Sequence, residues 1–119
     1  MYSPQVLDHF EHPRNAGDVE HPDASAQVEN PACGDILKLT LRIANNRITE
    51  ARFRAKGCVP AMACGSLLTE QITNKSLPDA AALDVSGLIT AAGGLPPASG
   101  HAAHLAIDTL RKALATINH

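Results

Sequence analysis

The chain has 119 residues, of which 45% are hydrophobic and 18% charged, and its formal net charge is −2. This length and composition predict one globular domain, residues 1–119, with a core that needs no disulfide bonds. The weak negative charge and the scattered basic residues argue against nucleic-acid and anionic-membrane partners, and no stretch is long and apolar enough to span a membrane.

The first thirty residues predict a short helix, a loop and an edge strand. Ser3 and Pro4 are typical of an N-cap and a first helical turn, and Pro13 ends the helix. Residues 15–23 show no periodicity and predict a loop. Residues 24–29 are a candidate edge strand.

Two alternating stretches predict an antiparallel hairpin. In residues 36–42, three leucines alternate with mainly polar residues. Residues 44–47 predict a turn, because asparagine tolerates left-handed backbone. Residues 48–56 resume the alternation, which places Ile48 on the solvent face together with Arg52. The hairpin is therefore expected to have one buried and one wet face.

The rest of the chain predicts helices. Pro60 suits the first turn of a helix that runs to about residue 74, and a second helix is expected over residues 80–92, with Gly87 as its weak point. A rigid loop at 93–97 precedes a final helix with a regular apolar stripe. Strands followed by helices predict an α+β fold, in which helices cover one face of a small antiparallel sheet of about three strands.

Two cysteines flank the predicted hairpin. Cys33 precedes its first strand and Cys58 follows its second, and both points lie at the end of the hairpin opposite the turn. We therefore expect the two sulfur atoms to be neighbours. Gly34 allows a tight backbone approach, so that Asp35 can turn its carboxylate toward the same point. Because Cys58 also precedes a helix N-terminus, we expect a lowered thiol pKa, which suits a metal ligand or a nucleophile.

The cysteines also have a plainer interpretation. We recognise no signal peptide and expect a reducing cytoplasm, where three cysteines are not disulfide partners. Free cysteines are commonly small buried apolar residues. For Cys33 and Cys58, the flanking glycine and proline residues and the nearby aspartate favour a metal or thiol site instead.

The remaining cysteine and two histidines have separate interpretations. Cys64 falls on the apolar stripe of its helix and is expected in the core, with the role of an additional ligand as the alternative. His101 begins the last helix after the stiff Pro-Pro loop and is a candidate metal ligand. His104, on the flank of that helix, is expected at the surface.

Three other functions are disfavoured. His9 and His12 lie three residues apart on the first helix, but with no third ligand nearby they are expected to be structural or surface residues. The glycines at 17 and 93–94 lack the strand and helix context of a phosphate-binding loop, which argues against nucleotide binding. A thiol enzyme with Cys58 as its nucleophile is disfavoured because no histidine is placed as its base and because Asp35 beside it would raise the pKa of the thiol.

Four motifs, spread over nearly the whole chain, occur together. They are Tyr2-Ser3-x-x-Val6-x-Asp8-His9-Phe10-x-x-Pro13-Arg14-Asn15-x-Gly17, Asn30-Pro31-x-Cys33-Gly34-Asp35, Gly57-Cys58, and Leu95-Pro96-Pro97 followed by His101. Through these motifs the chain resembles the IscU/NifU-type family of iron–sulfur cluster scaffolds. The resemblance implies an α+β sandwich and a scaffold rather than an enzyme.

The resemblance also implies a site, a cargo and partners. The implied ligands are Cys33, Asp35, Cys58 and His101, together with a third cysteine. The implied cargo is iron or a labile [2Fe–2S] cluster, with zinc as an alternative occupant of the same place. The implied partners are a cysteine desulfurase, an iron donor and apo-protein acceptors, often with an Hsp70-type chaperone.

The chain departs from the family at two positions. Ala102 stands where the third site cysteine is usual, and Ser99 stands where the chaperone-recognition stretch usually has a lysine. The remaining two thiolates, one carboxylate and one imidazole make a complete tetrahedral zinc site. An alternative function is therefore that of a divergent zinc-binding relative, with a structural or regulatory role and no cluster assembly.

Overall fold

The computed structural model describes residues 2–31 and 33–117. Its elements, in chain order, are α1 (Pro4–Glu11), β1 (Ala24–Asn30), β2 (Asp35–Ala44), β3 (Arg47–Lys56), α2 (Val59–Ile72), α3 (Leu77–Ala81), α4 (Val85–Ala91), the 3-10 turn η1 (Pro97–Ser99) and α5 (Gly100–Ala115). The strands form one antiparallel sheet in the order β1-β2-β3. Within this described part, none of the helices is long and apolar enough to cross a membrane.

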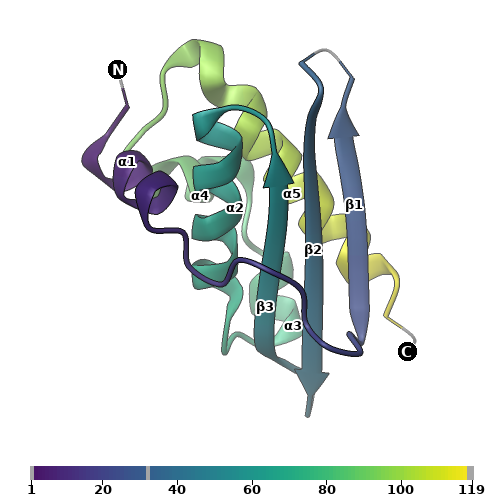
Figure 1. Ribbon diagram of the computed structural model, residues 1–119. Coiled ribbons are helices and arrows are strands. Elements are labelled where there is room, and N and C mark those ends of the chain that lie inside the picture. Colours follow the sequence, from purple (N-terminus) through teal and green to yellow (C-terminus); the bar gives the residue numbers. More distant parts are fainter. Residues whose placement is uncertain (1, 32, 118–119) are drawn as a thin grey trace.

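Helices cover one face of the sheet. α2 packs over β3, while α5 packs over β1 and β2 (Figure 1). The core between these layers is aliphatic, and Phe53 is the one aromatic side chain among its buried members. β2 and α5 contribute several of its largest side chains, namely Leu37, Leu39, Leu41, Ile107 and Leu110. The predicted α+β fold, with three strands and helices on one face, is confirmed.

The hairpin contains a bulge that the alternation did not predict. Arg42 pairs with residue 50, but the next residue, Ile43, pairs with Ile48, so Thr49 is left over between them. Because side chains alternate between the two faces of a sheet, this extra residue moves the side chains at the start of β3 to the opposite face. Ile48 is fully buried as a result, and its predicted place on the solvent face is wrong. The turn itself is as predicted, with positive φ angles at residues 45 and 46.

The helix predicted over residues 80–92 is two helices, α3 and α4. Asp84 is the N-cap of α4, and its Oδ1 accepts a hydrogen bond from the Gly87 N–H at 2.7 Å. Gly87, the expected weak point, therefore lies inside α4. A capping aspartate competes with helix continuation because its side chain satisfies a free N–H of the following turn.

Residues 12–23, which we call the strap, leave α1 and cross the face of the sheet opposite the helices (Figure 1). Val19 is buried there, and its N–H donates to Thr40 Oγ1 on β2 at 2.9 Å. Asp18 forms an ion pair with Arg54 of β3 at 2.6 Å. The strap thus gives the second face of the sheet its own cover.

The outer edge of β3 is covered by two segments. The strap reaches it first, where the Gly17 N–H donates to the Phe53 carbonyl at 2.8 Å and the Phe53 N–H donates to the Asn15 carbonyl at 3.0 Å. Nearer the turn, the Ile48 N–H donates to the Lys75 carbonyl at 2.9 Å. At the other side of the sheet, β1 pairs with β2 alone among the described residues.

Candidate metal centre

Four side chains from four segments meet at the end of the hairpin opposite its turn. Cys33 lies in the loop between β1 and β2, and Asp35 is the first residue of β2. Cys58 is the N-cap of α2, and His101 lies in the first turn of α5. The hairpin brings both cysteines to one end, as its topology predicted, and α5 adds the imidazole.

Three of the side chains converge on one carboxylate oxygen of the fourth, Asp35. Asp35 Oδ2 lies 3.3 Å from Cys33 Sγ and 3.2 Å from Cys58 Sγ, and both thiols donate hydrogen bonds to it. His101 Nε2 lies 3.6 Å from the same oxygen. The other oxygen, Oδ1, accepts the Cys58 N–H at 3.1 Å. Asp35 therefore lies at the centre of the cluster, where it contacts the other three side chains, and its own side chain is almost wholly buried.

Three of these residues already lie within the reach of a single ion. Ligand atoms of Cys33, Asp35 and His101 are all within 4.8 Å of one another. No other group of three or more His, Cys, Asp or Glu side chains comes as close among the described residues. Cys58 is not within that distance of all three atoms, and it joins the cluster through its contact with Asp35.

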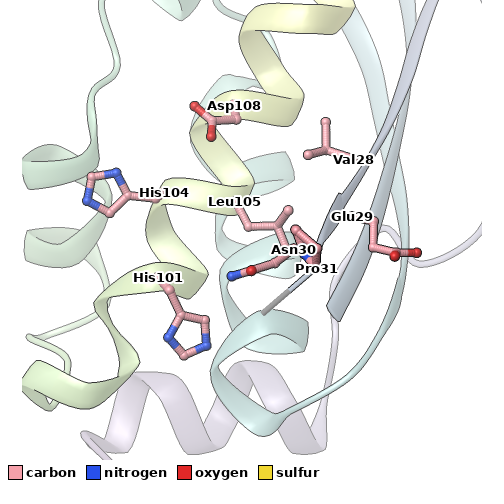
Figure 2. Close-up of a pocket in the computed structure, with 8 residues that line it drawn as sticks. All are labelled: Val28, Glu29, Asn30, Pro31, His101, His104, Leu105 and Asp108. Atoms are coloured by element: carbon pink, nitrogen blue, oxygen red, sulfur yellow. The ribbon is translucent and has the colours of Figure 1, made fainter. Parts of the chain in front are cut away.

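Two pockets meet at His101. One, of about 410 Å³, exposes the cluster and is also lined by Tyr2, Gly57, Pro60 and Ser99. The other, of about 310 Å³, lies between the end of β1 and α5 (Figure 2). His104 lines this second pocket and is exposed, as predicted, and its imidazole projects from α5 in a different direction from that of His101.

The contacts of Asp35 change its pKa. Burial by itself raises the pKa of this carboxyl, because it disfavours the charged form. Hydrogen bonds from the Cys58 and Cys33 thiols and from the Cys58 N–H, with the nearby His101, outweigh burial and lower the pKa below its ordinary value. Asp35 is therefore ionised at neutral pH, as a metal ligand must be.

The lowered pKa expected for Cys58 is wrong. Burial raises the pKa of its thiol, and the Asp35 carboxylate and Cys33 raise it further. The backbone at Ala61, in the first turn of α2, acts in the opposite direction but does not prevail. Without a metal ion, Cys58 is thus a protonated donor to Asp35, and metal binding at this thiol has to release its proton.

Cys64 packs in the core, as its place on the apolar stripe of α2 favours. Its side chain is fully buried. Burial, with a smaller contribution from Cys58, raises the pKa of the Cys64 thiol to about 12. The structure does not bring this sulfur into the group around Asp35.

The two unusual positions lie on either side of His101. Ala102 is 1% exposed and belongs to the core, so a methyl group stands at the position where the resemblance implies a third cysteine. Ser99 is nearly buried and lines the pocket of the cluster. The site therefore contains two thiols rather than three.

A second buried polar cluster joins α1, the strap and α2. His9 Nδ1 and Ser66 Oγ are 2.7 Å apart, and the Arg14 N–H donates to the same hydroxyl at 2.8 Å. Burial, followed by the charge of Arg14, lowers the pKa of His9, while Glu70 acts in the opposite direction. His9 is structural and His12 exposed, in line with the sequence. Ser66 was not singled out, because 57 residues separate it from His9.

The chain matches a known family model along its whole length. The model is that of the NifU-like N-terminal domain, and it matches residues 1–119. The iron–sulfur cluster assembly scaffold protein IscU of Escherichia coli K12 is 40% identical, over 96% of this chain and 91% of that protein. IscU 1 of Archaeoglobus fulgidus is 39% identical, over 96% of this chain and 74% of that protein.

Solved structures share the fold. A candidate iron–sulfur cluster assembly scaffold protein for the SUF system, from Fervidobacterium islandicum AW-1, superposes with a TM-score of 0.79 and 22% identity, over 95% of this chain and 96% of that one. A NifU-like N-terminal protein from Brucella abortus gives a TM-score of 0.63 and 19% identity, over 92% and 76%. At these identities the likeness is one of fold.

Proposed function

The chain belongs to the NifU-like N-terminal domain family, and from this premise we propose that it is a scaffold on which iron–sulfur clusters are assembled. One observation on the chain itself carries the proposal. Two thiols, a carboxylate and an imidazole from three separate parts of the chain converge beside an open pocket. A scaffold needs such a site, because its cargo has to enter and leave.

We propose Cys33, Asp35, Cys58 and His101 as the ligands. Two atoms bound to one tetrahedral ion at 2.0–2.3 Å lie about 3.3–3.8 Å apart. The separations of the two sulfurs and the imidazole nitrogen from Asp35 Oδ2 are 3.3, 3.2 and 3.6 Å, close to that range. Small side-chain movements are therefore enough for Cys33, Asp35 and His101 to share one metal ion, and Cys58 joins them by moving closer to the other ligand atoms.

The mixture of ligands suits a cargo that is passed on. Thiolates and imidazole bind cluster iron well, whereas a carboxylate oxygen is a poorer partner for it. We therefore propose iron or a labile [2Fe–2S] cluster as the cargo, with zinc as an alternative occupant. With Ala102 in place of a third cysteine, His101 completes the iron coordination, since histidine can replace cysteine on a cluster iron.

We propose a cysteine desulfurase, an iron donor and apo-protein acceptors as the partners. A chaperone that reads the Leu95–Ser99 stretch would meet a serine instead of a lysine, and we leave it out of the proposed set. We place the protein in the cytoplasm, because Cys33, Cys58 and Cys64 are all free thiols and a reducing compartment keeps them so. In this role the chain is a carrier and not an enzyme.

Anaerobic reconstitution tests the function and the ligands together. The protein is incubated with ferrous iron, sulfide and a thiol, desalted, and examined by visible absorption. We expect a coloured product from the parent chain and its loss in Cys33→Ala and Cys58→Ala, because each variant removes one of only two sulfur ligands.

Cys64→Ala is the matched control for these variants. It removes a thiol from the same helix that Cys58 caps, but one that lies in the core, and we expect it to keep the colour. A colourless parent protein contradicts cluster assembly. Colour that survives both site substitutions contradicts the proposed ligands.

A further inference from the structure

Gly57 lies against the Asp35 carboxylate, between the end of β3 and Cys58. A Cβ atom built on Gly57 would stand 2.0 Å from Asp35 Oδ1, 2.6 Å from Asp35 Cγ and 3.1 Å from Asp35 Cα. Carbon atoms do not approach a carboxylate so closely. The space that any other residue would need at position 57 is therefore filled by Asp35.

The carboxylate has no simple way to yield that space. Turning the carboxylate about its own bond would move Oδ1 but leave Cγ in place, and Cγ alone forbids the Cβ. Relief of the two shortest contacts requires the whole side chain of Asp35 to swing away. It would then lose the Cys58 N–H at Oδ1 and leave the point where Cys33, Cys58 and His101 meet at Oδ2.

We infer that Gly57 is a positioning residue for this site: its missing side chain makes the room in which the Asp35 carboxylate is held at the centre of the ligands. The inference deepens the proposed function, on which it rests for the ligand role of Asp35. Position 57 thereby decides whether the site has an oxygen ligand in addition to its thiols and imidazole.

Backbone strain has to be separated from this contact. Gly57 has a φ of +145°, a region that side chains rarely adopt, so Gly57→Ala is strained wherever its Cβ points. Gly17 provides the matched control. Its φ is +120°, and nothing lies within 4 Å of a Cβ built there. Gly17→Ala imposes similar strain without displacing a ligand.

The test is a double-mutant cycle between Gly57→Ala and Asp35→Ala, with Gly17→Ala beside it. Cobalt(II) is the probe, because its visible absorption reports tetrahedral binding by thiolates, and anaerobic titration gives its affinity. We expect Gly57→Ala to weaken cobalt binding at least about tenfold, as Asp35→Ala does, since each removes the same oxygen ligand. The double variant should bind no more weakly than Asp35→Ala alone, and Gly17→Ala should bind like the parent.

Thermal unfolding of the metal-free variants supplies a second readout. Gly57→Ala should lower the unfolding temperature more than Gly17→Ala, and most of this excess should disappear when Asp35 is already alanine, since the 3.1 Å contact with Asp35 Cα then remains. If Gly57→Ala does not fold, folding of the double variant supports the contact. Failure of the double variant as well, while Gly17→Ala folds, overturns the inference.

The two proposals fail in different ways. The role of Gly57 is overturned by parent-like cobalt affinity in Gly57→Ala or by losses of affinity that multiply in the double variant. It is also overturned by a thermal excess that is undiminished when Asp35 is alanine. A parent chain that binds no cobalt and assembles no cluster contradicts the proposed function instead. The thermal cycle still decides whether Gly57 makes room for Asp35.

Discussion

Two buried polar clusters are attached to α2, and they are built differently. At Ser66, one hydroxyl is shared by His9 and the Arg14 N–H, and the cluster fastens α1 and the strap to the helix. At Asp35, two thiols and an imidazole crowd around a single oxygen, and a pocket opens beside them. The first cluster joins structural elements to one another, whereas the second directs the proposed ligands at one oxygen atom beside a pocket that is open to solvent.

The comparison shows that a buried histidine or aspartate is not in itself a sign of function. Convergence on one point, together with access from solvent, distinguishes the cluster that can bind. Substitutions at the Ser66 cluster should therefore change the free energy of unfolding and leave metal binding alone. Substitutions of the Asp35 side chain should weaken metal binding and change the free energy of unfolding less.

The largest effect is expected for Ser66→Ala. The Arg14 N–H and the His9 imidazole would lose their shared partner in a buried place, which costs about 2 kcal/mol of unfolding free energy. Urea unfolding measures this loss, and cobalt titration should show an unchanged affinity.

Ser86→Ala is the control for that prediction, since Ser86 is an exposed serine on α4. Its cost should be below about 0.5 kcal/mol. If Ser66→Ala weakens cobalt binding as much as it weakens the fold, the separation of the two clusters is wrong.

A smaller effect, of opposite kind, is expected for Asp35→Ala. Cobalt binding should weaken about tenfold, or about 1.4 kcal/mol, because one ligand is lost. Its unfolding temperature should fall less than that of Ser66→Ala, because removal of a buried charge offsets the lost hydrogen bonds. Asp108→Ala, an exposed carboxylate in the neighbouring pocket (Figure 2), should change neither quantity. Equal losses of affinity in both variants would show a general effect of charge.

The smallest effect is a difference in pH dependence. The folded chain lowers the pKa of His9, so the unfolded chain binds a proton more readily, and stability falls as the pH drops below about 6.5 toward the folded value. The folded chain also lowers the pKa of Asp35, so its contribution is present above 3.8 and is lost only as the pH falls through the lower folded value.

Unfolding temperatures of the metal-free protein, measured from pH 7.5 to pH 3, separate the two windows. His9→Gln keeps a polar side chain but cannot titrate, and it should flatten the curve between pH 6.5 and the folded pKa of His9. Asp35→Ala should leave that part of the curve unchanged. A slope that is identical in His9→Gln and the parent assigns the acid sensitivity to other groups.

The alternation of strands and the apolar stripes of helices predicted the architecture, because each of these patterns repeats over several residues of an element. Alternation of apolar and polar residues predicts the strands. The topology of a hairpin then places Cys33 and Cys58 at the end opposite its turn. The same rule failed at Ile48, because one extra residue, Thr49, reverses the facing of a strand and leaves no periodic signal. The helical pattern likewise did not predict that Asp84 would cap a new helix, α4.

The site depended on contacts that no local pattern contains. The N-terminus of α2 argues for a lowered pKa at Cys58, but burial raises this pKa, with a further contribution from Asp35, and the extent of burial is fixed only when the chain is folded. The meeting of Asp35 with Gly57 is of the same kind. His101 was identified from its loop and by resemblance, and its distance from Asp35 depends on how α5 crosses the sheet.

The unequal cover of the two sheet edges limits how copies of this protein can pair through their strands. Residues of the strap and Lys75 close the outer side of β3, whereas β1 pairs with β2 alone in the part of the chain that the structure describes. An edge strand is a template for strand addition. Two copies joined through β1 about a twofold axis would use this edge in both copies, and the outer side of β3 that remains is covered at Ile48 and Phe53.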